Sequence, residues 1–184
     1  MLSIVGVGIC EGQITERASK IIKDAEIVFG SKRALKLASK FIVGKTMELN
    51  RFNEEIYKEI EKIAQEKNVV VLSTGDPMIA GLGTKLKGYV EPGISSVQMA
   101  LAKLREDLCN AIVIDAHAKN AEKEFDLIER RNLIILADKK FDPSVFGSRK
   151  VALLEDLCGN EKLVIGKANE IKIGSDYSIL FLWK

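Results

Sequence analysis

The chain has 184 residues, of which 47% are hydrophobic, with 28 lysines and arginines against 26 aspartates and glutamates. This composition excludes a wholly disordered or collagen-like chain. The length is sufficient for one large domain or two small ones with a buried core. The net charge of +2 predicts no nucleic-acid partner, because such partners require concentrated positive charge. The longest apolar runs are about one strand long, so no membrane-spanning segment and no membrane partner are expected.

The first residues of the chain and its cysteines indicate where the protein is located and whether it binds a metal. Residues Met1–Gly8 lack the basic beginning of a secretory signal peptide and run directly into a glycine-punctuated strand. We therefore expect a cytoplasmic protein. The three cysteines show no Cys-x-x-Cys spacing, so no metal site is predicted.

The first half of the sequence alternates strands with helices. Short apolar runs ending at glycine or at polar residues predict the strands, and apolar residues repeating every three or four positions predict the helices. The expected strands are 2–7, 27–29 and 69–72, and the expected helices are 18–25, 56–64 and 97–104. Ser95 or Ser96 suits the N-cap of the last helix. Val69–Leu72 is apolar throughout, which is typical of a central strand in a parallel sheet.

A new strand pattern begins at Ala111, after the polar stretch 105–110. We therefore expect two domains, residues 1–106 and residues 107–184. The second half predicts strands at 111–114, 133–136, 151–154, 163–165 and 179–183, with helices near 121–129 and 143–149. The last two strands are expected to form a hairpin whose turn is 172–176. The alternation of both element types predicts an α/β fold.

Gly6-Val7-Gly8 lies between the first strand and the first helix, where dinucleotide-binding proteins carry their glycine fingerprint. The third glycine of that fingerprint is absent, and Glu11 would repel a pyrophosphate at the start of the helix. A tight turn is therefore favoured over a nicotinamide site.

Two further polar loops follow predicted strands. Ser73-Thr74-Gly75-Asp76-Pro77 comes directly after the buried strand, and Pro92-Gly93-Ile94-Ser95-Ser96 precedes the helix 97–104. Ligands of open α/β sheets bind at the carboxyl ends of strands, so both loops are candidate sites. Turn formation by Asp76 and capping by the two serines explain the same residues without a ligand.

The ordered combination of these three motifs resembles the tetrapyrrole methylase family. Pro92–Gln98, Ala25–Arg33, Asp115–His117 and Val151–Leu157 are most similar to its cobalt-precorrin-7 C5-methyltransferases. The resemblance implies two α/β domains with S-adenosylmethionine in the cleft between them. It also implies a homodimer that methylates a carbon of a cobalt-precorrin, a corrinoid of vitamin B12 (cobalamin) synthesis.

Site residues are carried over from the same resemblance. It implies cofactor contacts at Ile9, Thr74, Gly75, Asp76, Ile79, Ser95, Ser96, Ala137 and Leu154, and substrate contacts at Gly8, Lys32, Arg33 and Lys119. Two segments depart from the family pattern. The first loop has Ile9-Cys10-Glu11 where the family has Pro-Gly-Asp, and His117 is followed by Ala118-Lys119 instead of Gly-Arg.

His117, the only histidine, is the candidate general base. It is expected at the end of a strand, with Asp115 too close in sequence to face the same way, and a purely structural role is the alternative. The alternatives for the whole protein are another methylase of the same fold and a non-catalytic nucleotide-binding module. The methylase would act at another precorrin position, on uroporphyrinogen III, or in diphthine synthesis.

Overall fold

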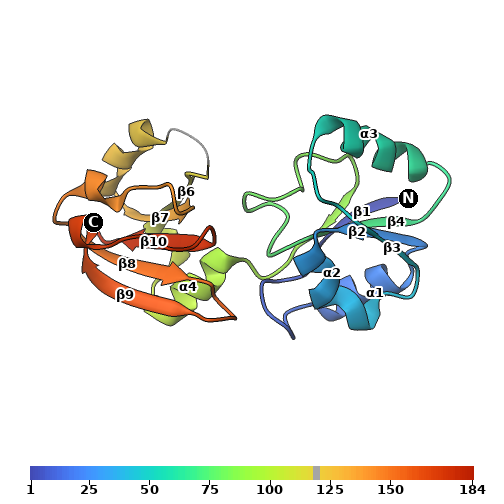
Figure 1. Ribbon diagram of the computed structural model, residues 1–184, viewed down its shortest axis with the longest axis horizontal. Coiled ribbons are helices and arrows are strands. Elements are labelled where there is room, and N and C mark those ends of the chain that lie inside the picture. The colour runs from blue at the N-terminus through green and yellow to red at the C-terminus, as the bar shows by residue number, and fades with distance from the viewer. Residues whose placement is uncertain (118–120) are drawn as a thin grey trace. The chain divides into compact units, whose positions relative to one another are not determined.

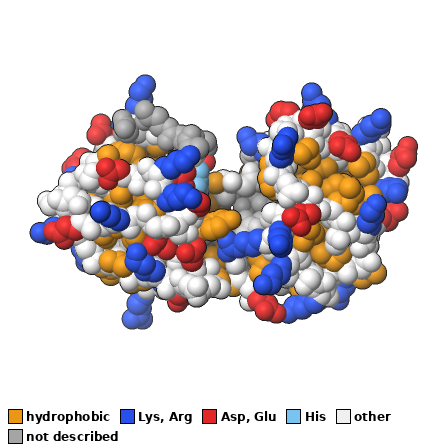
Figure 2. Space-filling view, in the orientation of Figure 1, with side chains coloured by type: hydrophobic (Ala, Val, Ile, Leu, Met, Phe, Trp, Pro, Cys, Tyr) orange, Lys and Arg blue, Asp and Glu red, His pale blue; other side chains and the backbone are white. Residues whose placement is uncertain are grey.

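The computed structural model describes residues 1–117 and 121–184 and divides into two compact units, Met1–Ser95 and Ser96–Lys184 (Figure 1). The boundary differs from the expected one after residue 106, because helix α4 (Ser96–Leu104) is fixed to the second unit. Trp183 Nε1 donates a hydrogen bond of 2.7 Å to Glu106, and Lys103 forms an ion pair of 2.9 Å with Glu161. The space-filling view shows acidic and basic side chains interspersed on both units (Figure 2).

The first unit is built on a parallel five-stranded sheet of order β3-β2-β4-β1-β5. Its strands are β1 (Leu2–Gly6), β2 (Ile27–Gly30), β3 (Lys45–Glu48), β4 (Val69–Ser73) and β5 (Tyr89–Glu91). β4 lies at the centre and is buried along its whole length, which confirms the expectation drawn from Val69–Leu72. β3 was not predicted, because it is an edge strand with four exposed residues and no apolar pattern.

Helices cover both faces of this sheet (Figure 1). α1 (Glu16–Lys23), α2 (Lys32–Ala38) and the short 3₁₀ helix η1 (Ser39–Phe41) lie on one face, and α3 (Glu54–Ile63) lies on the other. Ile22 of α1 and Ile60 of α3 are fully buried against opposite faces of the strands. Each such side chain contributes about 1.5–3 kcal/mol of hydrophobic stabilisation. Thr15, Ser31 and Asn53 cap the three α-helices by accepting backbone hydrogen bonds.

The second unit contains a mixed sheet of order β6-β7-β10-β8-β9. Its strands are β6 (Ala111–Asp115), β7 (Asn132–Ala137), β8 (Lys150–Glu155), β9 (Lys162–Lys167) and β10 (Ser178–Leu182). Only β6 and β7 are parallel. The expected β9–β10 hairpin is wrong: β9 pairs with β8, and β10 lies between β7 and β8. Every residue of β10 is buried, which requires a neighbour on each side, whereas β9 is largely exposed and suits an edge.

Four short 3₁₀ helices connect the described strands of the second unit, and two of them lie where helices were expected, near 121–129 and 143–149. They are η2 (Leu108–Asn110), η3 (Glu122–Glu129), η4 (Pro143–Phe146) and η5 (Ala168–Glu170). Phe125, Phe141 and Phe146 pack ring against ring beside the sheet, with centroids 4.8–6.4 Å apart. Within residues 1–117 and 121–184, the helices are too short or too polar to cross a bilayer.

Candidate functional site

Four glycines bring together the loops at the carboxyl ends of β1, β4 and β5. A Cβ atom on Gly6 would lie 2.6 Å from the Gly93 nitrogen and 2.8 Å from the Gly75 oxygen. A Cβ atom on Gly93 would lie only 2.3 Å from the Gly75 oxygen. Gly8 and Gly75 form a β-bridge, in which the Gly75 N–H donates to the Gly8 carbonyl over 2.8 Å. The motifs from three distant parts of the sequence therefore meet backbone to backbone, which only glycine permits here.

Asp76 fastens two of these loops together. Its Oδ2 accepts the backbone N–H of Gly93 at 3.0 Å, and its Oδ1 accepts the N–H of Met78 at 2.7 Å. The second bond is the turn expected for Asp-Pro, and the first reaches 17 residues along the chain. Both carboxylate oxygens are thus engaged with backbone donors, so Asp76 positions the loops.

Ile9 faces the same corner as Gly75 and Ser95. The Cβ position on Gly75 is 3.5 Å from Ile9 Cγ2 and 3.7 Å from the Ser95 Cα atom. The loop carrying Ile9 is held from behind by Gln13, whose Oε1 accepts the Ile9 N–H at 2.8 Å and the Cys10 N–H at 3.0 Å. Gln13 was not singled out in the sequence, where it reads as a loop residue.

The three cations expected to bind substrate, Lys32, Arg33 and Lys119, do not share one environment. Arg33 Nη2 donates to the carbonyl of Ile9 at 3.2 Å, so it braces the first loop. Lys32 is exposed at the first position of α2. Lys119 lies outside the described residues.

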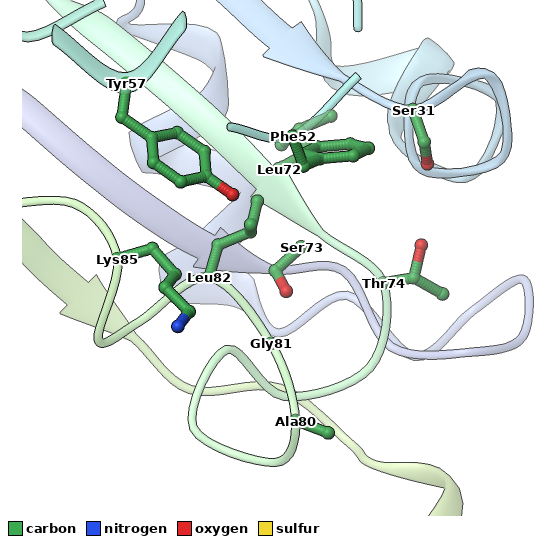
Figure 3. A pocket seen from close by; sticks show the side chains of 10 residues that line it. All are labelled: Ser31, Phe52, Tyr57, Leu72, Ser73, Thr74, Ala80, Gly81, Leu82 and Lys85. Atoms are coloured by element: carbon green, nitrogen blue, oxygen red, sulfur yellow. The ribbon is translucent and has the colours of Figure 1, made fainter. Parts of the chain in front are cut away.

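A pocket of about 390 Å³ opens beside this corner, between the end of β4, the start of α3 and the loop after Ile79 (Figure 3). Among the described residues, Thr74 is the only expected site residue that lines it. The other lining residues are Ser31, Phe52, Tyr57, Leu72, Ser73, Ala80, Gly81, Leu82 and Lys85. One signal for it was present in the sequence: Phe52 is an aromatic residue inside a polar segment, and it is 45% exposed.

The two expected cofactor residues of the second unit are buried on opposite faces of its sheet. Ala137 pairs with Ser178, whereas Leu154 pairs with Ile179, the next residue along β10. Both side chains are 0% exposed. Alternate residues of a strand face opposite sides, so these two side chains cannot contact a common ligand on one face of the sheet.

The edge of the sheet beside Ala137 is organised by Glu155, whose side chain is 5% exposed. It accepts the backbone N–H groups of Gly174 at 2.6 Å and Ser175 at 3.0 Å and pairs with Lys162 at 3.0 Å. Burial raises the pKa of Glu155, but these donors together outweigh burial and leave the pKa below its ordinary value. The charged glutamate therefore fixes the segment that leads into β10.

His117 follows β6 and contacts Asp115, contrary to expectation. Its Nδ1 lies 2.9 Å from Asp115 Oδ1, and its backbone N–H donates to the same oxygen at 3.2 Å. Residues two apart on a strand share a face, and the chain turns after Asp115, so the contact is favourable. The aspartate orients the imidazole and leaves Nε2 as the outer nitrogen. Within the described part of the chain, no three His, Cys, Asp or Glu side chains gather into a metal site.

These features define a class: a two-unit α/β protein with glycine-rich loops gathered at the carboxyl ends of parallel strands, where such folds bind ligands. Residues 1–170 match the model of the Tetrapyrrole (Corrin/Porphyrin) Methylases. The chain belongs to this family. It is 34% identical to a probable cobalt-precorrin-7 C(5)-methyltransferase of Methanocaldococcus jannaschii, over 98% of this chain and 95% of the relative.

Solved structures agree with this assignment. The crystal structure of the cobalamin biosynthesis precorrin-6Y methylase CbiE from Archaeoglobus fulgidus superposes with a TM-score of 0.89 at 43% identity, covering 100% of this chain and 98% of that one. A uroporphyrin-III C-methyltransferase from Thermus thermophilus, solved with S-adenosylhomocysteine, shares the fold with a TM-score of 0.74 at 19% identity. That match covers 100% of this chain and 97% of the other.

Proposed function

We propose that this protein transfers a methyl group from S-adenosylmethionine to C5 of cobalt-precorrin-7. The observation that carries the proposal is the full-length similarity to the Methanocaldococcus jannaschii enzyme, in which both chains are covered almost completely. The high structural similarity to CbiE supports it. The related methylases of other tetrapyrrole positions share the fold at lower identity.

The geometry of the corner formed by Ile9, Gly75 and Ser95 supports a cofactor site there. Gly75 has a φ of +75° and no side chain, so a ligand can approach its backbone closely beside an apolar and a hydroxyl-bearing neighbour. We propose that the cofactor is held here, with Thr74, Ile79 and Ser96 nearby in sequence. Backbone atoms around Ala137 and Leu154 would contribute from the second unit. When bound, S-adenosylmethionine supplies a methyl group on a positively charged sulfur.

The protein's own part in this reaction is to orient the two reactants and to exclude water. The substrate carbon forms a bond to the methyl group, the carbon–sulfur bond breaks, and the substrate releases one proton. Nε2 of His117 is the proposed acceptor of that proton, because Asp115 already occupies Nδ1. Asp76 acts indirectly by holding the loops in place.

We also propose that the enzyme is a cytoplasmic homodimer. Leu163 and Ile165 on the edge strand β9 are 48% and 51% exposed, which gives the second unit an apolar surface for a partner copy. Light scattering at micromolar concentration tests this. A single species of 20.3 kDa would refute the dimer.

A turnover assay tests the activity. Protein incubated with S-adenosylmethionine and enzymatically prepared cobalt-precorrin-7 should form S-adenosylhomocysteine and a singly methylated corrinoid in equal amounts. Binding of neither cofactor form at millimolar concentration to folded protein would refute the methyltransferase assignment.

A further inference from the structure

The pocket beside the cofactor corner has apolar walls and a few polar groups. Phe52, Leu72 and Leu82 supply apolar surface, and Lys85 is the one cation among the described residues of the lining (Figure 3). All of these residues belong to the first unit. Small-molecule sites combine such apolar walls with a few placed polar groups.

Two largely buried residues present hydroxyl groups to this space. Tyr57 and Ser73 are 7% and 4% exposed, yet among the described residues neither hydroxyl has a hydrogen-bond partner. Tyr57 directs its hydroxyl into the group of lining side chains (Figure 3). Both hydroxyls are therefore accessible from the pocket and able to donate a hydrogen bond to a ligand there.

The polar groups of the pocket favour an acceptor that carries negative charge. Burial raises the pKa of Tyr57, and the charge of Glu54 raises it further, so the phenol keeps its proton at neutral pH and is able to donate. The ion pairs between described residues do not include Lys85, so its ammonium group is available as well. Among the described residues that line the pocket there is no carboxylate; Glu54 acts on Tyr57 from outside the lining.

The size of the pocket limits the ligand to part of a large molecule. About 390 Å³ lies at the lower end of the range for small-molecule sites, well below what a tetrapyrrole macrocycle with all its side arms would fill. One arm of a corrin precursor, a short methylene chain ending in a carboxylate, matches the lining. Its methylenes would pack on Leu72 and Leu82, and its carboxylate would reach the donors.

We infer that this pocket receives one acidic side arm of the corrin substrate, and that Lys85 and Tyr57 donate hydrogen bonds to its carboxylate. The inference rests on the proposed function and assigns a substrate contact to a cation other than Lys32, Arg33 or Lys119. Lys85 thereby fixes how the ring is oriented beside the methyl donor. Its contribution is a charge-assisted hydrogen bond in a partly dry site.

Cobyrinic acid, a stable corrin with seven carboxyl groups, and its neutral heptamethyl ester are suitable probes. Calorimetry should show that Lys85→Gln weakens binding of the acid about tenfold, whereas Lys85→Arg restores most of it. Tyr57→Phe should weaken it about threefold to fivefold. The ester should bind wild type and Lys85→Gln equally. Added salt should weaken binding of the acid less in Lys85→Gln than in wild type.

Lys58→Gln is the matched control, because Lys58 is an exposed lysine of α3 outside the pocket lining. It should bind the acid within twofold of wild type. Affinity for S-adenosylhomocysteine, measured on each variant, should not change.

The outcomes separate the two proposals. If wild type binds S-adenosylhomocysteine but not cobyrinic acid, or if Lys85→Gln binds the acid as wild type does, the pocket assignment is overturned while the cofactor site stands. If folded wild type binds neither ligand, the proposed function itself fails.

Discussion

Replacing Asp76 by asparagine tests whether the loops at the strand ends are held by one carboxylate. In the wild type its two oxygens accept the N–H groups of Met78 at 2.7 Å and Gly93 at 3.0 Å. An asparagine side chain has only one oxygen, so one of these backbone donors would face an NH₂ group instead. The Gly93 nitrogen is the more costly one to leave unpaired, because Gly93 is buried and touches Gly6 and Gly75.

The size of the effect follows from these two bonds. A hydrogen bond to a charged acceptor contributes about 1.5–3 kcal/mol, and a neutral one about 1 kcal/mol. Losing one bond and weakening the other should lower the free energy of unfolding by about 2–3 kcal/mol. The half-buried position of Asp76 favours the lower figure. The S-adenosylhomocysteine affinity should fall about tenfold, since the loops that would hold it are no longer tied together.

Urea titration followed by circular dichroism measures the loss, and Trp183 fluorescence reports on the second unit separately. Asp107→Asn is the matched control, because Asp107 accepts one backbone N–H in an exposed turn of the second unit. It should cost less than about 1 kcal/mol. If Asp76→Asn retained wild-type stability and affinity, the loops would be held by other contacts and our account of the corner would be wrong.

Three further predictions concern other parts of the site. Gly93→Ala should destabilise the first unit by about 3 kcal/mol in urea titration, because the new methyl group meets backbone atoms that cannot rotate away; Gly159→Ala, whose Cβ atom has an ordinary contact at 3.5 Å, should be nearly neutral. Glu155→Gln should be less stable than wild type at pH 7 by about 1–2 kcal/mol. Because the Glu155 pKa is lowered on folding, this advantage of the wild type exists above the ordinary value of 4.5 and should disappear as the pH falls below it; a difference independent of pH would contradict the assignment. His117→Ala should leave S-adenosylhomocysteine affinity within twofold and lower turnover about 100-fold, and wild-type turnover would assign the histidine a structural role.

The elements that could be predicted from the sequence are those whose burial produces a local pattern of apolar residues. Val69–Leu72 reads as a central strand because each residue is apolar, and the structure confirms it. β3 carries no such pattern, because an exposed edge strand can be built from Lys45, Thr46 and Glu48. The pairing of β10 was mispredicted because short sequence separation favours hairpins, whereas complete burial of Leu180 and Phe181 requires strands on both sides.

The site was predictable to the extent that its motifs lie at strand ends. Gly75 and Asp76 lie at the end of β4 as expected, and Asp76 accepts the backbone N–H of Gly93; their contact with the cofactor stays a prediction. Phe52 was the one signal of the pocket in the sequence; Tyr57 reads as one more apolar position on a helix and Lys85 as a solvated loop residue, so the pocket was not predicted. Only tertiary packing brings them to one cavity. The contact of Asp115 with His117 was missed because residues two apart on a strand, which share a face, were taken to face different ways.

The position of the transferred methyl group tests the central claim most directly. Cobalt-precorrin-7 is incubated with the protein and S-adenosylmethionine labelled with ¹³C in its methyl group, and the purified corrinoid is analysed by carbon NMR. Our account predicts a single new labelled methyl group bonded to C5. A label at another ring carbon would assign the protein to a different methylation step, and an unlabelled corrinoid in the presence of bound cofactor would contradict the proposed function.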